Sequence, residues 1–182
     1  MKVSHAGLEG VLVIEPRVFE DARGYFFETF RIERYREAGI DSVFTQDNVS
    51  YSAKNALRGL HFQHPHDQAK LVQVIRGEIF DVAVDIRKSS PTFGRWFGAV
   101  LSEGNHRQLF VPVGFAHGFC VLSDEAHVTY KCSDIYSPSD EGGILWSDPD
   151  IAIDWPVASP LLSPKDTQFP RLKDIPSDRL PQ

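Results

Sequence analysis

The chain has 182 residues and a mass of 20.5 kDa, a length that suits one domain with a sizeable buried core. Its formal net charge of -6 excludes the broad basic surface that binding to nucleic acid requires. No apolar run approaches the ~20 residues of a membrane span or forms a secretion signal, and there are only two cysteines, so we expect a soluble, cytoplasmic protein with buried thiols at Cys120 and Cys132.

Short strands separated by turns dominate the chain. In chain order, alternating or apolar runs predict strands over 11–14, 24–30, 43–51, 57–63, 69–75, 78–87, 95–102, 107–111, 116–122 and 127–132. A single helix is predicted, over residues 31–38, where it is stopped by Gly39. This density of strands predicts an all-β sandwich or closed barrel.

One run shows a clear period of two, and the C-terminal part of the chain shows none. Within 78–87, one face holds Phe80, Val82, Val84 and Ile86, and the other holds Asp81, Ala83 and Asp85. From about residue 157 the chain is rich in proline, serine and aspartate, which predicts an extended tail that wraps the barrel or ends disordered. No internal boundary is evident, so we expect a single domain over 1–182.

Two histidines lie within short apolar stretches, His61 in RGLHFQ and His117 in PVGFAHGF. Strict alternation places His61 on one face of its strand with Gln63, and Arg58 on the opposite face. His117 falls on the same face as Phe119 and Val121. Each histidine taken alone fits a hydrogen-bonded core residue as well as a functional one.

The spacing around these histidines resembles the cupin jelly rolls, but one expected metal ligand is missing. PVGFAH matches the second cupin signature, PxGxxH, and the first signature falls on His64, His66, Lys70 and Gly77. Lys70 stands where cupins carry a glutamate ligand, and an ammonium group has no lone pair for a cation and repels it. We therefore predict no metal, although a metal-dependent cupin enzyme stays an alternative because His64 and His66 are present.

The remaining polar groups indicate proton chemistry. A neutral histidine with a pKa near ~6.5 can accept a proton at neutral pH. A nearby lysine supplies positive charge where an oxyanion develops, and Tyr130 in HVTYKC can supply a proton from another direction. Base, electrophile and acid together describe enolisation next to a ketone.

Many blocks of sequence resemble one family in the same order. These are DARGYFFETF, QDNVSYS, LRGLHFQ, QAKLVQVIRGEIFDVAVDIRKSSPTFG, FVPVGFAHGF, TYKCSDIYSP, SDPDIAIDWP and LSPKD. From about Gly7 to Asp166 the chain resembles the dTDP-4-dehydrorhamnose 3,5-epimerases of dTDP-L-rhamnose synthesis. The resemblance implies a cupin-type double-stranded β-helix, or jelly roll, with a few short helices. It also implies epimerisation at C3 and C5 of dTDP-4-dehydro-6-deoxy-D-glucose, with no cofactor.

The same resemblance implies residue roles. His61 would be the base, oriented by Asp166; Lys70 would hold the C4 oxygen as it becomes an enolate, and Tyr130 would be the acid on the other face. The residues implied to bind the dTDP-sugar are Arg23, Glu28, Gln46, Asp47, Asn48, Arg58, His117, Tyr136, Glu141 and Lys165. Among them Tyr136 would stack on the thymine, and arginines suit a diphosphate. A homodimer with exchanged strands is implied as well.

Several alternatives stay open. A relative that epimerises only C3 or C5, or a 3,4-ketoisomerase, would share this scaffold, and the presence of both His61 and Tyr130 favours the double epimerase. A non-catalytic sugar-binding module is a further possibility. The chain contains neither GxGxxG nor GxxxxGK[ST], so it predicts no Rossmann or P-loop nucleotide site.

Overall fold

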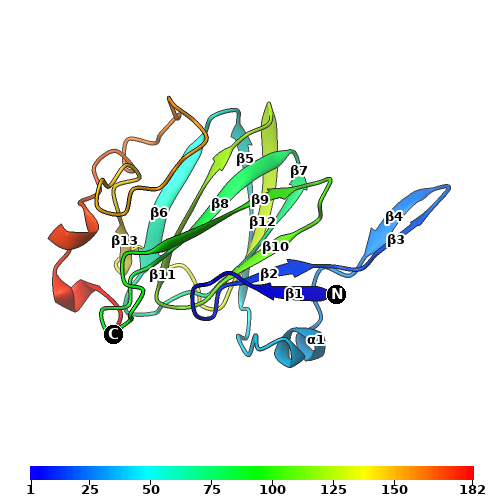
Figure 1. Ribbon diagram of the computed structural model, residues 1–182, viewed down its shortest axis with the longest axis horizontal. Helices are drawn as coiled ribbons and strands as arrows, with labels where there is room; N and C mark the ends of the chain where they lie inside the picture. Colours follow the sequence, from blue (N-terminus) through cyan, green and yellow to red (C-terminus); the bar gives the residue numbers. More distant parts are fainter.

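Two antiparallel β-sheets lie face to face in the computed structural model, which describes residues 1–182 (Figure 1). The strand order in the six-stranded sheet is β1 (Lys2–His5), β2 (Leu12–Glu15), β10 (Gln108–Val111), β7 (Lys70–Arg76), β12 (Glu125–Cys132) and β5 (Gln46–Ala53). The order in the five-stranded sheet is β13 (Glu141–Gly143), β6 (Leu57–Gln63), β11 (Phe115–Val121), β8 (Glu78–Asp85) and β9 (Trp96–Ser102). The predicted all-β jelly roll is confirmed.

The main core fills the space between the two sheets. Alternate residues of β7 and β12, among them Val72, Val74 and Val128, point inward from the six-stranded sheet, and Ile79 and Leu101 meet them from the five-stranded sheet. Each of these side chains is at most 2% exposed, so each contributes about 1.5–3 kcal/mol of burial free energy. The same inward alternation carries Lys70 and Tyr130 toward the space between the sheets.

The outer face of the six-stranded sheet is partly covered by helix α1 (Ile32–Glu37), which confirms the predicted helix with slightly shorter ends. Tyr35 and Ile40 pack against Leu12, Ile14 and other outward side chains of β2, β7 and β10. The Tyr35 hydroxyl lies 2.8 Å from the Thr29 carbonyl and 2.5 Å from Gln108 Oε1, and its one proton can be donated to either oxygen. Every helix of the chain is far shorter than the ~20 residues that a membrane-spanning helix needs.

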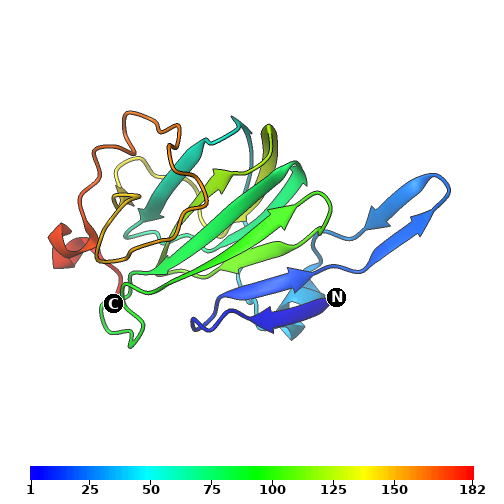
Figure 2. The same ribbon diagram turned by 45° about the horizontal axis from the view of Figure 1, so that its top comes forward.

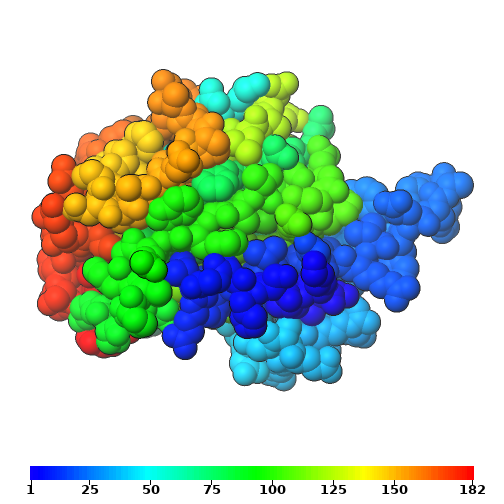
Figure 3. Space-filling model, in the orientation of Figure 1, coloured from blue at the N-terminus to red at the C-terminus, as the bar shows by residue number.

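The C-terminal segment covers the outer face of the five-stranded sheet. Leu172, in the 3₁₀ helix η1 (Leu172–Asp174), packs with the outward apolar face of β8. A second 3₁₀ helix, η2 (Ser177–Arg179), follows before the chain ends, and Figure 3 shows these orange and red residues closely packed on the body of the molecule. Because the core lies on one side of β8 and this segment on the other, β8 is buried on both faces, including Asp81 and Asp85 at 0% exposure.

A separate hairpin projects from the body as an arm (Figure 2). It consists of β3 (Val18–Asp21) and β4 (Gly24–Phe27), which pair with each other and with no other strand. The prediction of one strand over 24–30 was wrong at its end, and the partner strand β3 was missed, as were the short edge strands β1 and β13. Phe26 is 71% exposed and Tyr25 57% exposed on the arm, so large aromatic side chains face solvent.

A bulge in β6 changes which residues share a face with His61. His117 pairs with His61, but Phe119 pairs with Arg58, so β6 has one residue more than β11 between these two pairs. Arg58 therefore lies on the inner face with His61, and the prediction that it points to the opposite face was wrong. Gly59 permits the bulge, because it has a φ of +121° and a Cβ there would lie 2.7 Å from the Gly118 Cα.

Leu172 tests the contribution of the C-terminal segment to stability. We expect Leu172→Ala to lower the free energy of unfolding by about 2–5 kcal/mol, because it leaves a cavity against β8. Urea denaturation measures the change. Leu161→Ala is the matched control, since Leu161 is 61% exposed, and a loss as large as that of Leu172→Ala would contradict the packing argument.

Candidate active site

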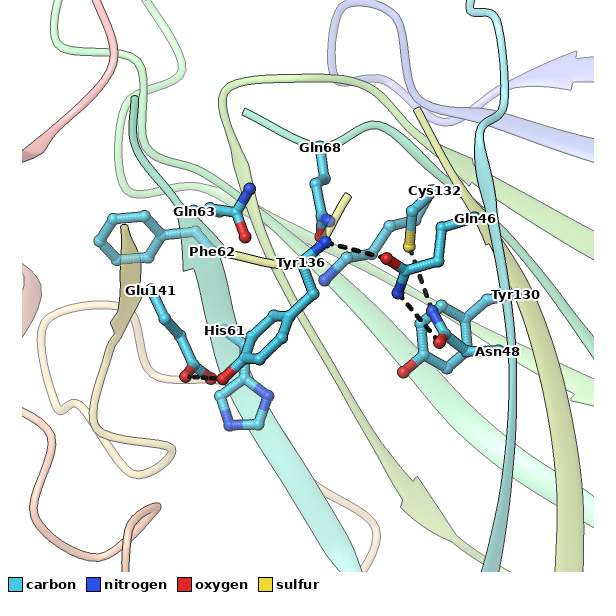
Figure 4. Close-up of a pocket in the computed structure, with 11 residues that line it drawn as sticks. Gln46, Asn48, His61, Phe62, Gln63, Gln68, Tyr130, Cys132, Tyr136 and Glu141 are labelled. Carbon is cyan, nitrogen blue, oxygen red and sulfur yellow. Dashed lines mark hydrogen bonds between the residues drawn. The ribbon is translucent and has the colours of Figure 1, made fainter. Parts of the chain in front are cut away.

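A cavity of about 330 Å³ lies between the two sheets (Figure 4). Its polar walls come from β5, β7 and β12 on one side and from β6 and β13 on the other. The lining residues are Gln46, Asn48, His61, Phe62, Gln63, Gln68, Lys70, Tyr130, Cys132, Tyr136 and Glu141. The histidine, lysine and tyrosine singled out from the sequence therefore share one cavity.

The His61 ring is hydrogen-bonded to a buried carboxylate. Its Nε2 lies 2.6 Å from Asp166 Oδ1, and Asp166 is 3% exposed while His61 opens toward the cavity. Burial alone would raise the pKa of Asp166, but the hydrogen bond and the charge of His61, together with the Ser163 side chain, hold this pKa below its usual value. Asp166 is therefore ionised at neutral pH and orients the imidazole, with Nδ1 as the free ring nitrogen.

Lys70 places a positive charge in the cavity with no ion-pair partner. It begins β7 and lies directly opposite Cys132 of β12, and no carboxylate forms a salt bridge with its ammonium group. Burial lowers the pKa of Lys70, while the negative charges of Asp81 and Glu141 at longer range act to raise it. Because no carboxylate pairs with this amino group, its protonated form can interact with an oxyanion in the cavity.

Tyr130 presents a neutral phenol from the inner face of β12. Burial raises the pKa of this phenol above its usual value, and the positive charge of Arg58 opposes the shift. Arg58 reaches this region because its guanidinium group donates hydrogen bonds to the Ser52 side chain and the Tyr51 carbonyl of β5. The phenol is therefore protonated at neutral pH and can act as a proton donor.

Tyr136 and Glu141 form one wall of the cavity, as Figure 4 shows. The Tyr136 hydroxyl donates a hydrogen bond to Glu141 Oε2 at 2.7 Å, and Lys165 forms an ion pair with the same carboxylate. The Tyr136 N–H donates to Gln46 Oε1, and the Gln46 amide in turn donates to Asn48. Half-exposed, the Tyr136 ring is available to a planar ligand group.

Other residues implied to bind substrate lie elsewhere within this chain. Arg23 is at the tip of the arm, where it pairs with Asp21, and Glu28 pairs with Arg31 and Arg34. Asp47 points outward from β5 to Lys131. His117 is buried next to His61 on the neighbouring strand, and its Nε2 lies 2.7 Å from Asp81 Oδ1. The structure therefore gathers only part of the implied set around one cavity.

Sequence reasoning missed four lining residues as site residues, Phe62, Gln63, Gln68 and Cys132. Two had a usable signal: Gln63 and Cys132 each lie two positions after a site residue on a strand and so share its face. Cys132 is a buried free thiol, like Cys120, as predicted. Phe62 and Gln68 carried no such signal.

His64 and His66 are each engaged with a carboxylate in the loops beside the cavity. His64 Nδ1 lies 3.0 Å from Asp67, and His66 Nδ1 lies 2.7 Å from Asp140, which raises the pKa of His66. No three His, Cys, Asp or Glu side chains are grouped in a way that could hold a metal ion.

The arrangement can support removal of a proton from carbon. An imidazole oriented by a carboxylate can accept the proton, an unpaired ammonium can stabilise the oxygen that becomes negative, and a neutral phenol can return a proton. Base and acid lie on β6 and β12, which belong to opposite sheets, so they can approach a bound ring from different sides. A small molecule with a carbonyl group beside the reacting carbon is the kind of substrate this chemistry requires.

Comparison with known proteins agrees with this chemistry. The family model described as dTDP-4-dehydrorhamnose 3,5-epimerase matches residues 5–174. A protein of that name from Shigella flexneri is 55% identical over 176 residues, which cover 96% of this chain and 97% of the relative. A less similar relative from Streptomyces niveus, 43% identical over 91% of this chain and 81% of its own length, is named dTDP-4-dehydrorhamnose 3-epimerase.

A solved structure of a related enzyme also matches this chain. The dTDP-6-deoxy-D-glucose-3,5-epimerase from Legionella pneumophila, determined in complex with dTDP-4-keto-L-rhamnose, superimposes with a TM-score of 0.97 at 49% identity. The match covers 100% of this chain and 97% of that one. The family model, the sequence identity and the shared fold together show that the chain belongs to the dTDP-4-dehydrorhamnose 3,5-epimerase family.

Proposed function

We propose that this protein epimerises dTDP-4-dehydro-6-deoxy-D-glucose at C3 and C5 to give dTDP-4-dehydro-L-rhamnose. The observation that carries the proposal is the shared cavity of His61, Lys70 and Tyr130 in a member of this family. The ketone at C4 acidifies both neighbouring carbons, so one base and one acid can serve both centres in turn. Free buried thiols at Cys120 and Cys132 fit a reducing compartment such as the cytoplasm.

In the proposed mechanism, His61 removes the proton from C3 or C5. Because Nε2 bonds to Asp166, Nδ1 accepts the proton, and the buried carboxylate stabilises the imidazolium that forms. Lys70 stabilises the C4 oxygen as it becomes an enolate, and Tyr130 returns a proton to the opposite face of the carbon. A positioned acid or base contributes ~10²- to 10⁴-fold, and one preorganised donor to an oxyanion about 3–4 kcal/mol.

Solvent isotope incorporation tests the reaction. With the keto-sugar nucleotide in deuterated water, we expect deuterium at both C3 and C5, because each inverted carbon receives its new proton from a group that exchanges with solvent. Mass spectrometry and NMR of the product measure the label. Incorporation at C3 alone would instead support the 3-epimerase reaction that the name of the Streptomyces niveus relative describes.

A matched pair of histidine variants controls this experiment. His61→Asn should abolish incorporation at both carbons, since it removes the proton acceptor. His5→Asn, at an exposed histidine in β1, should leave incorporation unchanged. Label entering at the wild-type rate in His61→Asn would refute the proposed base.

The charge on Lys70 predicts a pH dependence. Because burial lowers the pKa of Lys70 below 10.5, and the protonated form stabilises the enolate, kcat/KM should fall as the pH rises through this lowered pKa. Burial raises the pKa of Tyr130, which moves the loss of its proton to higher pH than in a free tyrosine. The Lys70→Arg variant stays protonated, so its activity should be lower but the alkaline fall in kcat/KM should move to higher pH. If this fall does not move, a group other than Lys70 causes it.

We propose further that the protein is a homodimer in which the arm of one chain reaches the site of the other. The outward face of the six-stranded sheet exposes Val49 by 75%, Tyr51 by 56% and Ile75 by 53%, which is unusual for aliphatic and aromatic side chains on one sheet face. The arm exposes aromatic side chains as well, and it carries Arg23 away from the cavity of its own chain. A second copy would cover both surfaces and add an arginine to each cavity.

Mixing two impaired variants tests this exchange. If Arg23 serves the site of the partner, Arg23→Ala and His61→Ala should complement each other when they are unfolded together and refolded. About one quarter of wild-type activity should return, because half of randomly formed dimers are mixed and each has one intact site. If Arg23 serves its own chain, no mixed dimer contains an intact site, and activity stays at the level of the separate variants.

A further inference from the structure

Three glutamine side chains hold the segment that carries Tyr136. Gln63 Nε2 donates to the Ile135 carbonyl at 3.1 Å, and Gln63 Oε1 accepts from the Ser137 N–H at 2.9 Å. Gln46 accepts from the Tyr136 N–H at 2.9 Å, and Gln68 donates to the Asp134 carbonyl at 2.8 Å. Backbone groups of all the residues from Asp134 to Ser137 are therefore bonded to glutamine amides that line the cavity.

Besides these amides, the segment is held by a bond from the Ile135 N–H to the Asp134 side chain and by the bond from the Tyr136 hydroxyl to Glu141. It lies between β12 and β13, outside both sheets, and Ile135 is 64% exposed. The only backbone-to-backbone hydrogen bond within residues 134–137 is the one that the Ser137 carbonyl accepts from Asp140 in the following turn. Backbone polar groups that lack a partner cost free energy, so loss of these amide bonds should destabilise the conformation that this segment has in the structure.

Gln63 is the central member of this set. It ends β6 two residues after His61, is 5% exposed, and uses its second amide hydrogen to donate to the His66 carbonyl at 2.6 Å. Both of its donors and its acceptor are thus satisfied by backbone groups. Because its contacts flank Tyr136 on both sides, Gln63 couples the position of the Tyr136 ring to the strand that carries the base.

We propose that Gln46, Gln63 and Gln68 form a glutamine clamp that holds Tyr136 ready to stack on the base of the nucleotide, and that Gln63 is a positioning residue for substrate binding. The inference rests on the proposed function, since it takes a deoxythymidine nucleotide as the ligand. Gln63 acts through Tyr136 and not through the reacting carbons. Its loss should therefore weaken nucleotide binding much more than it slows proton transfer.

The test is a double-mutant cycle on dTDP affinity, measured by isothermal titration calorimetry with the full chain. Gln63→Met keeps the side-chain length and removes the three hydrogen bonds, so the Kd for dTDP should rise about tenfold. In a Tyr136→Ala background the same substitution should change the Kd less than about twofold, because the ring that it positions is gone. An undiminished effect in that background, or an unchanged Kd in Gln63→Met alone, would overturn the clamp.

Two further variants keep the result interpretable. Gln73→Met is the matched control, because Gln73 is a buried glutamine whose amide bonds only to Gln108, on the outer face of the other sheet. It should leave the Kd for dTDP unchanged, and a tenfold rise there would attribute the effect to general loosening and overturn the clamp. If Gln63→Met does not fold, Gln68→Met takes its place in the same cycle, with an expected rise of about threefold.

Kinetics separate this inference from the proposed reaction. If wild-type protein turns over the keto-sugar nucleotide, Gln63→Met should raise KM about tenfold and lower kcat less than about threefold. A fall in kcat with an unchanged KM would overturn the positioning role while the epimerase function stands. If wild-type protein shows no turnover but the dTDP cycle behaves as expected, the proposed function fails and the clamp stands.

Discussion

The hydrogen bond between His61 and Asp166 is the interaction on which the arrangement of the site depends. It joins β6 to a residue 105 positions later in the C-terminal segment, at 2.6 Å. A buried carboxylate is stable only when its oxygens accept hydrogen bonds, so Asp166 needs the donor of His61 as much as His61 needs an orienting partner. Apolar contacts of Leu172 with β8 hold the segment that brings Asp166 there. The segment whose apolar side chains pack on the sheet is therefore the one that supplies the orienting carboxylate.

Strand β5 shows how a polar cavity reverses the usual pattern of a jelly roll. Gln46 and Asn48 point inward to the cavity, while Val49 and Tyr51 point outward and are exposed. In an ordinary sandwich the apolar face would be the inner one. The reversal is consistent with a cavity that must bind a polar ligand and with an outer face covered by a second chain, as proposed above. The glutamine amides extend the same polar lining to the loop of Tyr136.

Much of the fold was predictable, because a period of two is a local property of the sequence. The apolar face of 78–87 predicted β8, and the helix signal before Gly39 predicted α1. The same rule failed at Arg58, because a bulge shifts the alternation by one residue, and Gly59 beside it is the only local sign of that bulge. At the arm the pattern predicted β4 but missed β3, because this hairpin packs against neither sheet and so carries no buried face.

Residue types and their order by themselves determined the class of fold, the likeness to a keto-sugar epimerase family and the choice of His61, Lys70 and Tyr130 as chemical groups. Tertiary structure alone decided which of these share a cavity, because pairing of β12 with β7 and stacking of the two sheets join residues far apart in the chain. Only the tertiary structure showed that Tyr136 and Glu141 reach the cavity of this chain. Arg23 and Glu28, which the resemblance also implied, do not reach it. Spacing along a chain reports the face of a strand, whereas distance between strands follows from packing that no local pattern encodes.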